Sequence, residues 1–160
     1  MTAEHQMPTP DELGPVYTDD EQGSMTGAAY VFRRDGNGRW RQEAKLLPED
    51  PGALFELGKA VAIDGDTVVV GAEGGGEVGK FSGAAYVFRR EEGGWRQEAK
   101  LLASDRQPAD RFGNAVAVHG DTIAVGAHFA DPAGVGSGAA YVFRREQGRW
   151  RQIAKLMPRG

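Results

Sequence analysis

The 160-residue sequence contains no cysteine, so disulfide bonds and thiolate metal sites are excluded. Neither sign of charge is in large excess, because 19 Lys and Arg stand against 23 Asp and Glu for a net charge of −4. This balance argues against nucleic acid as a partner, since a nucleic-acid interface needs concentrated positive charge. No apolar run approaches the roughly 18 residues that a membrane helix needs, so membrane insertion is not expected.

Residues 1–14 lack the basic start and apolar stretch of a secretory signal, and no signal peptide is visible. They also lack apolar periodicity, so we expect a flexible N-terminal tail. Motifs for catalysis are missing as well: there is no Gly-x-Ser-x-Gly, no cysteine nucleophile and no His-Glu-x-x-His. We therefore predict no catalytic residue.

Glycine is abundant, with 24 residues, and it punctuates an internal repeat. The octapeptide GAAYVFRR occurs three times, and each copy leads to Trp-Arg-Gln and then Ala-Lys-Leu. The three tryptophans, Trp40, Trp95 and Trp150, are 55 residues apart. Two matching segments lie between the copies at the same spacing, LGKAVAIDGDTVVVGA from Leu57 and FGNAVAVHGDTIAVGA from Phe112.

Each repeat predicts four short strands, because its segments are rich in Val, Ile, Tyr, Phe and Trp and are bounded by glycine. Asp64-Gly65 and His119-Gly120 predict tight hairpins between the first and second strands, with positive φ at both residues of each pair. In the last repeat the predicted strands are residues 112–118, 122–127, 139–143 and 150–156.

A four-stranded antiparallel unit that repeats about every 50 residues indicates the blade of a β-propeller. The expected fold is therefore all-β, an incomplete ring of about two and a half blades, whereas propellers typically close with 4–8. We expect a partial first blade at residues 15–53, a second blade at 54–109 and a third at 110–160. The open arc would leave its end blades bare, so the remaining blades or other copies are expected partners.

These residues resemble the FG-GAP repeat of integrin α-subunit propellers, and more closely the bacterial FG-GAP proteins built of SGAAYVF, Trp-x-Gln-x-Ala-Lys-Leu and GDTxxVGA units. The motif is Phe112-Gly113 followed by Gly126-Ala127, and the resemblance extends over about residues 15–158. Leu57 replaces Phe in one copy. The resemblance implies a secreted or surface-attached, non-catalytic protein that serves adhesion, binding or scaffolding, with an extracellular protein or glycan as partner.

The segment GGGEVGK at residues 74–80 is similar to a phosphate-binding loop, but its context excludes that reading. Self-alignment places it in the link between the second and third strands of a blade, and SGAAYVFRR after it predicts a strand. A phosphate loop needs a helix there, whose N-terminus faces the anion. We interpret these glycines as turn residues and predict no nucleotide cofactor.

Integrin-type repeats commonly hold Ca²⁺ in an Asp-rich loop between the first two strands. Here that link is only IDGDT or VHGDT. Asp64 and Asp66 are too few, on too tight a hairpin, to supply the six to eight oxygens that Ca²⁺ prefers. The resemblance therefore carries over no metal site, and we predict no cofactor, with Ca²⁺ binding by the acidic loop residues as the alternative left open.

Acidic residues gather in the links between second and third strands and between blades, which emerge on one face of the ring. Loops on a rigid scaffold often bind ligands, and the alternative is that these are solvated loop ends. The tryptophans, at a fixed phase, are expected to pack between blades rather than to stack on sugars. The candidate ligand-binding residues are Asp50, Glu73, Asp105, Asp110 and Asp131.

The sequence thus predicts a non-catalytic binding, adhesion or scaffold module that belongs to a larger propeller. One alternative is the propeller fragment of a polysaccharide-acting enzyme, which would require polar groups unique to one blade. Another is a truncated fragment without independent function. Near-identical repeats favour repeated weak contacts over a single asymmetric active site.

Overall fold

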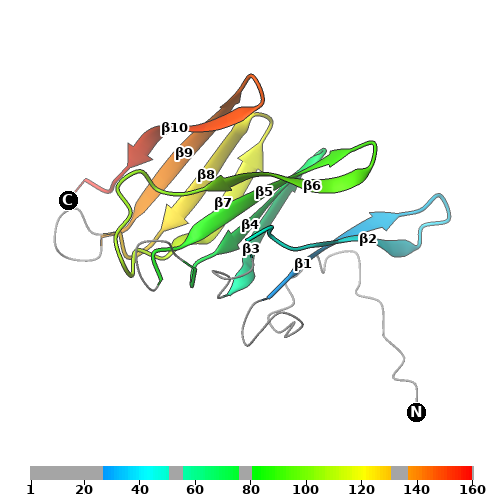
Figure 1. Cartoon of the computed structure of the whole chain (residues 1–160), viewed down its shortest axis with the longest axis horizontal. Coiled ribbons are helices and arrows are strands. Elements are labelled where there is room, and N and C mark those ends of the chain that lie inside the picture. The colour runs from blue at the N-terminus through cyan, green and yellow to red at the C-terminus, as the bar shows by residue number, and fades with distance from the viewer. Residues whose placement is uncertain (1–26, 51–55, 76–80, 131–136, 160) are drawn as a thin grey trace, which may run out of the picture.

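The computed structural model describes residues 27–50, 56–75, 81–130 and 137–159, and within them the chain is built of strands without a helix. Three antiparallel sheets stand side by side without closing into a barrel (Figure 1). The first sheet contains β1 (Ala29–Arg34) and β2 (Trp40–Leu46). The second contains β3 (Leu57–Asp64), β4 (Thr67–Ala72), β5 (Ala84–Glu91) and β6 (Gly94–Leu101). The third contains β7 (Phe112–His119), β8 (Thr122–Ala127), β9 (Ala139–Glu146) and β10 (Arg149–Leu156).

Both four-stranded sheets are simple meanders in which each strand pairs with the next along the chain. This confirms the predicted fold class, an all-β propeller segment with four-stranded antiparallel blades. The sheets are called blade 1, blade 2 and blade 3 below, in chain order. The third strand of blade 3 runs beyond the predicted end at Phe143, because Arg144 pairs with Arg151 and Arg145 pairs with Trp150.

The hairpins between the first two strands of a blade differ from the prediction. Asp64 pairs with Thr67, so the central residues of that turn are Gly65 and Asp66, and of these only Gly65 has positive φ, at 55°. The equivalent turn in blade 3 begins at Gly120, with φ of 54°. A glycine at the first central position is the arrangement of a type II′ turn, so Asp64 belongs to the strand.

The outer strand of every blade carries a β-bulge at the same phase of the repeat. In β6, Ala99 lies opposite Val87 and Gln97 lies opposite Phe88, so Glu98 is the extra residue. A bulge leaves its extra residue outside the ladder and can re-aim that side chain. The bulge residues are Glu43 in β2, Glu98 in β6 and Ile153 in β10.

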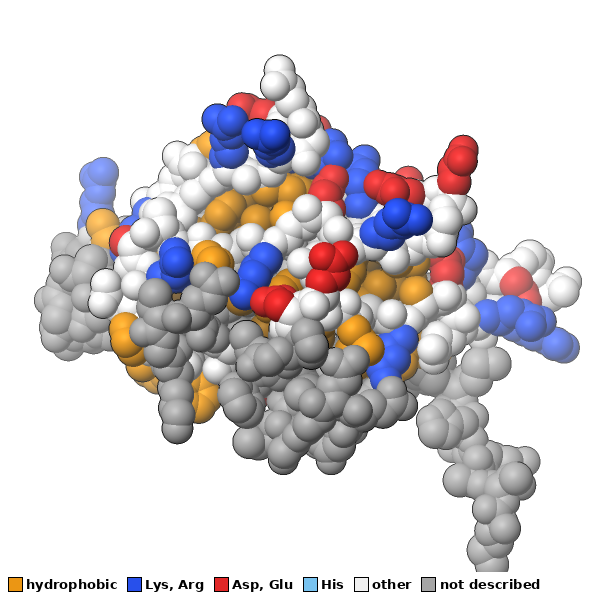
Figure 2. Space-filling model, viewed as in Figure 1, with side chains coloured by type: hydrophobic (Ala, Val, Ile, Leu, Met, Phe, Trp, Pro, Cys, Tyr) orange, Lys and Arg blue, Asp and Glu red, His pale blue; other side chains and the backbone are white. Residues whose placement is uncertain are grey.

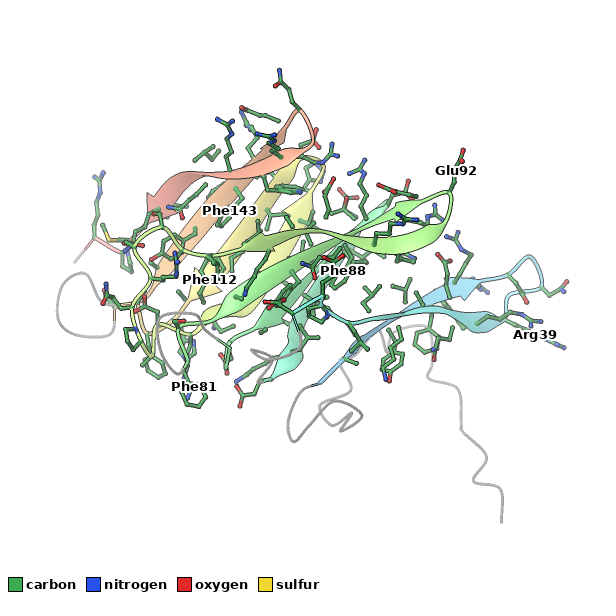
Figure 3. The ribbon with its side chains drawn as sticks, viewed as in Figure 1. Arg39, Phe81, Phe88, Glu92, Phe112 and Phe143 are labelled. Atoms are coloured by element: carbon green, nitrogen blue, oxygen red, sulfur yellow. The ribbon has the colours of Figure 1, made fainter. Side chains whose placement is uncertain are left out.

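The apolar core forms two layers, one in each space between neighbouring sheets. In the layer between blades 2 and 3, the buried Phe112 ring meets Tyr141 edge-on at a centroid distance of 5.4 Å and Phe143 at 6.0 Å. Figure 3 shows Phe112 and Phe143 in this layer, with Arg39 and Glu92 at the tips of two hairpins and Phe81 at the opposite end. Core residues therefore hold blades together rather than filling the centre of a barrel.

Glycines allow the blades to approach closely. Gly83 forms a parallel bridge with Phe112, and Gly27 forms the same bridge with Leu57 one repeat earlier. A Cβ on Gly71 would lie 1.9 Å from the carbonyl oxygen of Gly113, well inside van der Waals contact. The first strand of each later blade thus lies against the backbone of the blade before it.

The predicted flexible tail, residues 1–14, and residues 76–80 of the glycine-rich link lie outside the described residues. The link is followed by strand β5, as expected for a connection between strands. The part of the chain that the structure describes includes no helix of the length and apolar character needed to cross a membrane.

Candidate functional site

A hydrogen-bonded clamp joins neighbouring blades near the hairpin tips, and its acceptor is the bulge glutamate. Trp150 Nε1 of blade 3 donates to Glu98 Oε2 of blade 2 at 2.8 Å, and Arg145 donates to Glu98 Oε1 from Nε at 2.9 Å and from its terminal nitrogen at 2.6 Å. One repeat earlier, Trp95 Nε1 donates to Glu43 at 2.8 Å. The bulge thus directs each glutamate side chain toward the tryptophan of the next blade.

The electrostatics of Glu98 follow from this clamp. Burial alone would raise the pKa of Glu98, but the hydrogen bonds from Arg145 and Trp150 outweigh burial and hold the pKa below its ordinary value. The same ion pair raises the pKa of Arg145. Both groups are therefore charged at neutral pH. Figure 2 shows side chains of both signs lying next to each other along the upper edge of the molecule.

A second clamp joins the blades toward the opposite end, where the links between blades emerge. The hydroxyl of Tyr141 donates to Asp105 at 2.9 Å, and Lys155 also donates to this carboxylate. In the preceding repeat, Asp50 accepts from Lys100 at 2.6 Å and from Tyr86 at 3.4 Å. Asp50 and Asp105 thus link the end of one blade to the third and fourth strands of the next.

Burial dominates the titration of the two clamp tyrosines. It raises the pKa of Tyr86 to about 12 and also raises the pKa of Tyr141, so both hydroxyls keep their protons and remain donors. Burial would raise the pKa of Asp105 too, but the bonds from Lys155 and Tyr141 lower it overall. The carboxylate is therefore an ionised acceptor at neutral pH.

Glu73, immediately after β4, is fully buried at the boundary between blades 2 and 3. Its Oε1 accepts from Lys59 of its own blade and from Arg111 of the next, the latter at 3.1 Å. Its Oε2 has no hydrogen-bond partner within the described part of the chain and lies 4.0 Å from His128 Nδ1. Donors from two neighbouring blades thus share one buried carboxylate.

The structure places the five predicted ligand residues as follows. Asp50 and Asp105 belong to the second clamp and Glu73 to the buried ion pair, while Asp110 is buried and accepts from the Gln107 backbone N–H at 2.7 Å. Asp131 lies outside the described residues. The four described residues therefore have intramolecular partners, and a ligand on the acidic face stays a prediction.

Most of the repeat residues occupy positions between blades. Trp95 and Trp150 pack against the two core layers, and Phe112 and Ala127 are fully buried. Gly113 has φ of 94°, and a Cβ there would meet the Ala84 carbonyl oxygen at 2.2 Å. Gly126 lies in β8, opposite Ala115 of β7. Trp40 lies in blade 1, where its indole nitrogen is buried without a hydrogen-bond partner among the described residues.

An integrin-type calcium loop does not fit the residues present. The Asp64 carboxylate accepts from the Gly120 N–H of the next blade at 2.6 Å, and Asp66 accepts from Arg90 at 2.7 Å. Both carboxylates thus accept hydrogen bonds from protein donors, one at the end of β3 and one on the turn that follows it. Within the described ranges, no three His, Asp or Glu side chains gather closely enough to hold a metal ion.

A cluster that does not recur in the other repeat lies at the same blade boundary as Glu73. It is on the face where the links between second and third strands emerge, called the loop face below. The Arg111 guanidinium lies over the Phe81 ring at 4.8 Å and over the Phe129 ring at 5.6 Å, and His128 lies 4.2 Å from Phe129 between ring centroids. Phe129 is 51 % exposed. The equivalents of Arg111 and Phe129 one repeat earlier are Glu56 and Gly74, so this aromatic and cationic surface belongs to one boundary only within the described repeats.

The family model of the FG-GAP repeat matches residues 40–88 and 95–143, more than half of the chain. The chain belongs to the FG-GAP repeat family. Each matched segment begins in the outer strand of one blade and ends in the third strand of the next, so the sequence unit of this FG-GAP protein spans a blade boundary. A search of curated proteins finds no match to the chain.

Proposed function

We propose that this FG-GAP protein is a non-catalytic binding and scaffold module of a larger propeller-type assembly, working outside the cell or on its surface. The observation that carries the proposal is the pair of clamps repeated at both blade boundaries, Trp to Glu near the hairpin tips and Tyr to Asp at the other end. Membership of the FG-GAP family supports a propeller-type module. The extracellular location rests on the resemblance to adhesion and surface proteins.

The repeated polar side chains support a structural rather than a catalytic role. A general acid or base must be free to exchange a proton with a substrate. Glu98 and Asp105 are instead fixed by donors from the neighbouring blade, which hold both pKa values low. Tyr141 is held in its protonated form. With ionised acceptors on one blade and protonated donors on the next, these groups are suited to holding neighbouring blades together.

The binding part of the proposal is placed on the loop face. The link between second and third strands reads GAEGGGEVGKFSG in blade 2 and GAHFADPAGVGSG in blade 3, whereas the strands on either side are nearly identical. Variable loops on a constant scaffold are the usual arrangement of a recognition surface. The half-exposed Phe129, beside His128 and Arg111, offers an aromatic surface for an extracellular protein or glycan.

The proposal is tested by incubating the full chain with an array of glycans and extracellular matrix proteins. We expect saturable binding to at least one class, and a loss of about tenfold or more in the Phe129→Ser variant. The matched control is Ile63→Ser, since Ile63 is also about half exposed but lies on β3. An array that stays blank at high protein concentration would contradict the binding role.

A further inference from the structure

Arg111, the residue immediately before β7, is held in place by three side chains. Its guanidinium lies over the Phe81 ring at 4.8 Å and over the Phe129 ring at 5.6 Å. Its Nη1 donates to Oε1 of the buried Glu73 at 3.1 Å. A guanidinium fixed in this way loses little conformational freedom when it binds a further partner.

The opposite edge of the Arg111 guanidinium is free to bind such a partner. Its Nε and Nη2 have no hydrogen-bond partner among the described residues, and the side chain is 30 % exposed. Two N–H groups on one edge of a planar guanidinium match the two oxygens of a carboxylate, and this paired arrangement is a strong one. Arg111 is thus a preformed donor for an incoming carboxylate.

The side chains around Glu73 that reach solvent are cationic. Lys59 and Arg111 keep 39 % and 30 % of their side-chain surface exposed. The described acids nearby already have donors: Glu73 is shared by these two cations, and Asp105 and Asp110 accept the hydrogen bonds described above. An anion that reaches this boundary therefore meets a free donor edge.

Phe81 supplies one of the two rings from a strained backbone, at the end of the blades opposite the hairpin tips (Figure 3). Its φ is 63°, in the left-handed region that an aromatic residue rarely adopts. Its counterpart in the next repeat is Gly136, a residue type that adopts positive φ freely. The backbone N–H of Arg111 donates to the Phe81 carbonyl oxygen at 2.8 Å. Strain of this kind gathers at functional sites, which agrees with a role for this ring in holding the guanidinium.

Phe129 adds an apolar surface next to Arg111. Its side chain is about half exposed, and the His128 imidazole lies 4.2 Å from it between ring centroids. The His128 side chain also reaches solvent. An exposed aromatic ring offers contact to the C–H groups of a sugar, and an imidazole exchanges hydrogen bonds with hydroxyl groups. The surface beside the free edge of Arg111 therefore suits a sugar ring.

We propose that Arg111 binds the carboxylate of an acidic sugar, a hexuronate, whose ring C–H groups contact Phe129. The inference rests on the proposed binding function of the loop face and names the class of ligand. A hexuronate carries its carboxylate directly on a rigid ring, so one sugar unit can contact both side chains with little loss of conformational entropy. An acidic side chain of a protein is less suitable, because it reaches Arg111 on a flexible stem that must be ordered.

The test measures binding of the full chain to fluorescently labelled trigalacturonic acid by anisotropy. The control ligand is the same trisaccharide with its carboxylates methyl-esterified, which keeps the sugar rings and removes the negative charge. We expect the acid to bind at least about tenfold more tightly than the ester. This comparison leaves the protein unchanged.

Arg111→Lys tests the location, because lysine keeps the charge and loses the paired N–H edge. We expect this variant to bind the acid about tenfold more weakly and the ester within about twofold of the parent. Arg96→Lys is the matched control, since Arg96 is an exposed arginine of β6 without a partner among the described residues. It should leave the binding of both ligands within about twofold of the parent.

A second variant guards against misfolding, because Arg111 also contacts the buried Glu73. Phe129→Ser changes a half-exposed side chain and is expected to keep the melting temperature of the parent. It should weaken the acid and the ester by the same factor, since both ligands present the same C–H groups to the ring.

The inference is overturned if the acid and the ester bind equally, or if neither binds at about millimolar concentration. It is also overturned if folded Arg111→Lys keeps the full preference for the acid. A triglutamate peptide that binds as tightly as trigalacturonic acid would overturn the sugar assignment in favour of an acidic protein.

The ligand array separates failure of this inference from failure of the proposed function. Array binding that Phe129→Ser weakens, without any preference for the acid over the ester, refutes the hexuronate and leaves the binding role of the loop face. A blank array, together with no binding of either trisaccharide, refutes both.

Discussion

Glu98 shows how a single residue gains its role from backbone geometry. Strict alternation along β6 groups Glu98 with Arg96 and Lys100 on one side of the strand. The bulge interrupts that alternation and turns the carboxylate toward Trp150 and Arg145 of the next blade. The sequence offered one indication of this role, because Glu43 and Glu98 recur in phase with the tryptophans. Periodicity alone, however, does not locate a bulge.

The clamp predicts a pH-dependent contribution of Glu98 to stability. Its folded pKa is below the ordinary value of 4.5, so its contribution is present above that value and is lost as the pH falls through the folded pKa. We expect Glu98→Gln to lower the free energy of unfolding by about 1–3 kcal/mol at pH 7. The difference from the parent should shrink as the pH falls below 4.5.

Urea unfolding followed by circular dichroism between pH 7 and pH 3 measures this effect. Glu92→Gln is the matched control, because Glu92 is exposed at a hairpin tip, and it should stay within about 0.5 kcal/mol of the parent. A constant difference for Glu98→Gln across the whole pH range would show that lost packing, rather than the charge, causes the effect.

At the scale of strands and sheets, the sequence predicted most of the structure. Strand composition and the 55-residue phase located the blades and their meander order, because these follow from local pattern. The errors fall at the turns: Arg144 and Arg145 extend β9, and Asp64 belongs to β3. Turn type depends on which two residues close the ladder, and a dipeptide such as Asp-Gly allows more than one register.

The close approach of β4 to β7 predicts a large effect of one added methyl group. Gly71→Ala places a Cβ 1.9 Å from the Gly113 carbonyl oxygen. A backbone oxygen cannot move aside as the end of a flexible side chain can. We therefore expect the free energy of unfolding to fall by about 1–3 kcal/mol or more. Thermal and urea unfolding of the purified variants measure it.

Gly36→Ala is the control for this substitution. Within the described residues, a Cβ on Gly36 would have no neighbour within 4 Å, and its φ is not in the region that favours glycine. Its stability should therefore lie within about 0.5 kcal/mol of the parent. Equal effects of the two alanines would show that blades 2 and 3 do not approach as closely as described.

At the scale of the molecule, the chain is a linear stack whose layers depend on their neighbours. Within the described residues, blade 2 is covered on both sides, whereas β10 of blade 3 and the two strands of blade 1 lie at the ends. The sequence predicted this order of blades from the strands that it counted in each repeat. It did not predict that Asp50 and Asp105 accept hydrogen bonds from the next blade. Contacts of this kind depend on how two sheets are placed relative to each other, and the local sequence pattern does not give that placement.

The stack predicts graded amide hydrogen exchange. Protection should be greatest in β4 and β5, which are almost wholly buried, and least in β2 and β10 at the two ends. Exchange followed by mass spectrometry of peptic fragments measures the gradient. Equal protection in all three blades would instead indicate a single cooperative unit.

The two clamps also share an orientation. In each, the carboxylate comes from the earlier blade and the donors come from the later one: Glu43 and Asp50 face Trp95 and Tyr86. A stack of such blades is directional, with carboxylates on one face of each blade and their donors on the other. If one blade were turned over, its carboxylates would face the carboxylates of its neighbour. The three described blades therefore pack head to tail, and both of their junctions have the same direction.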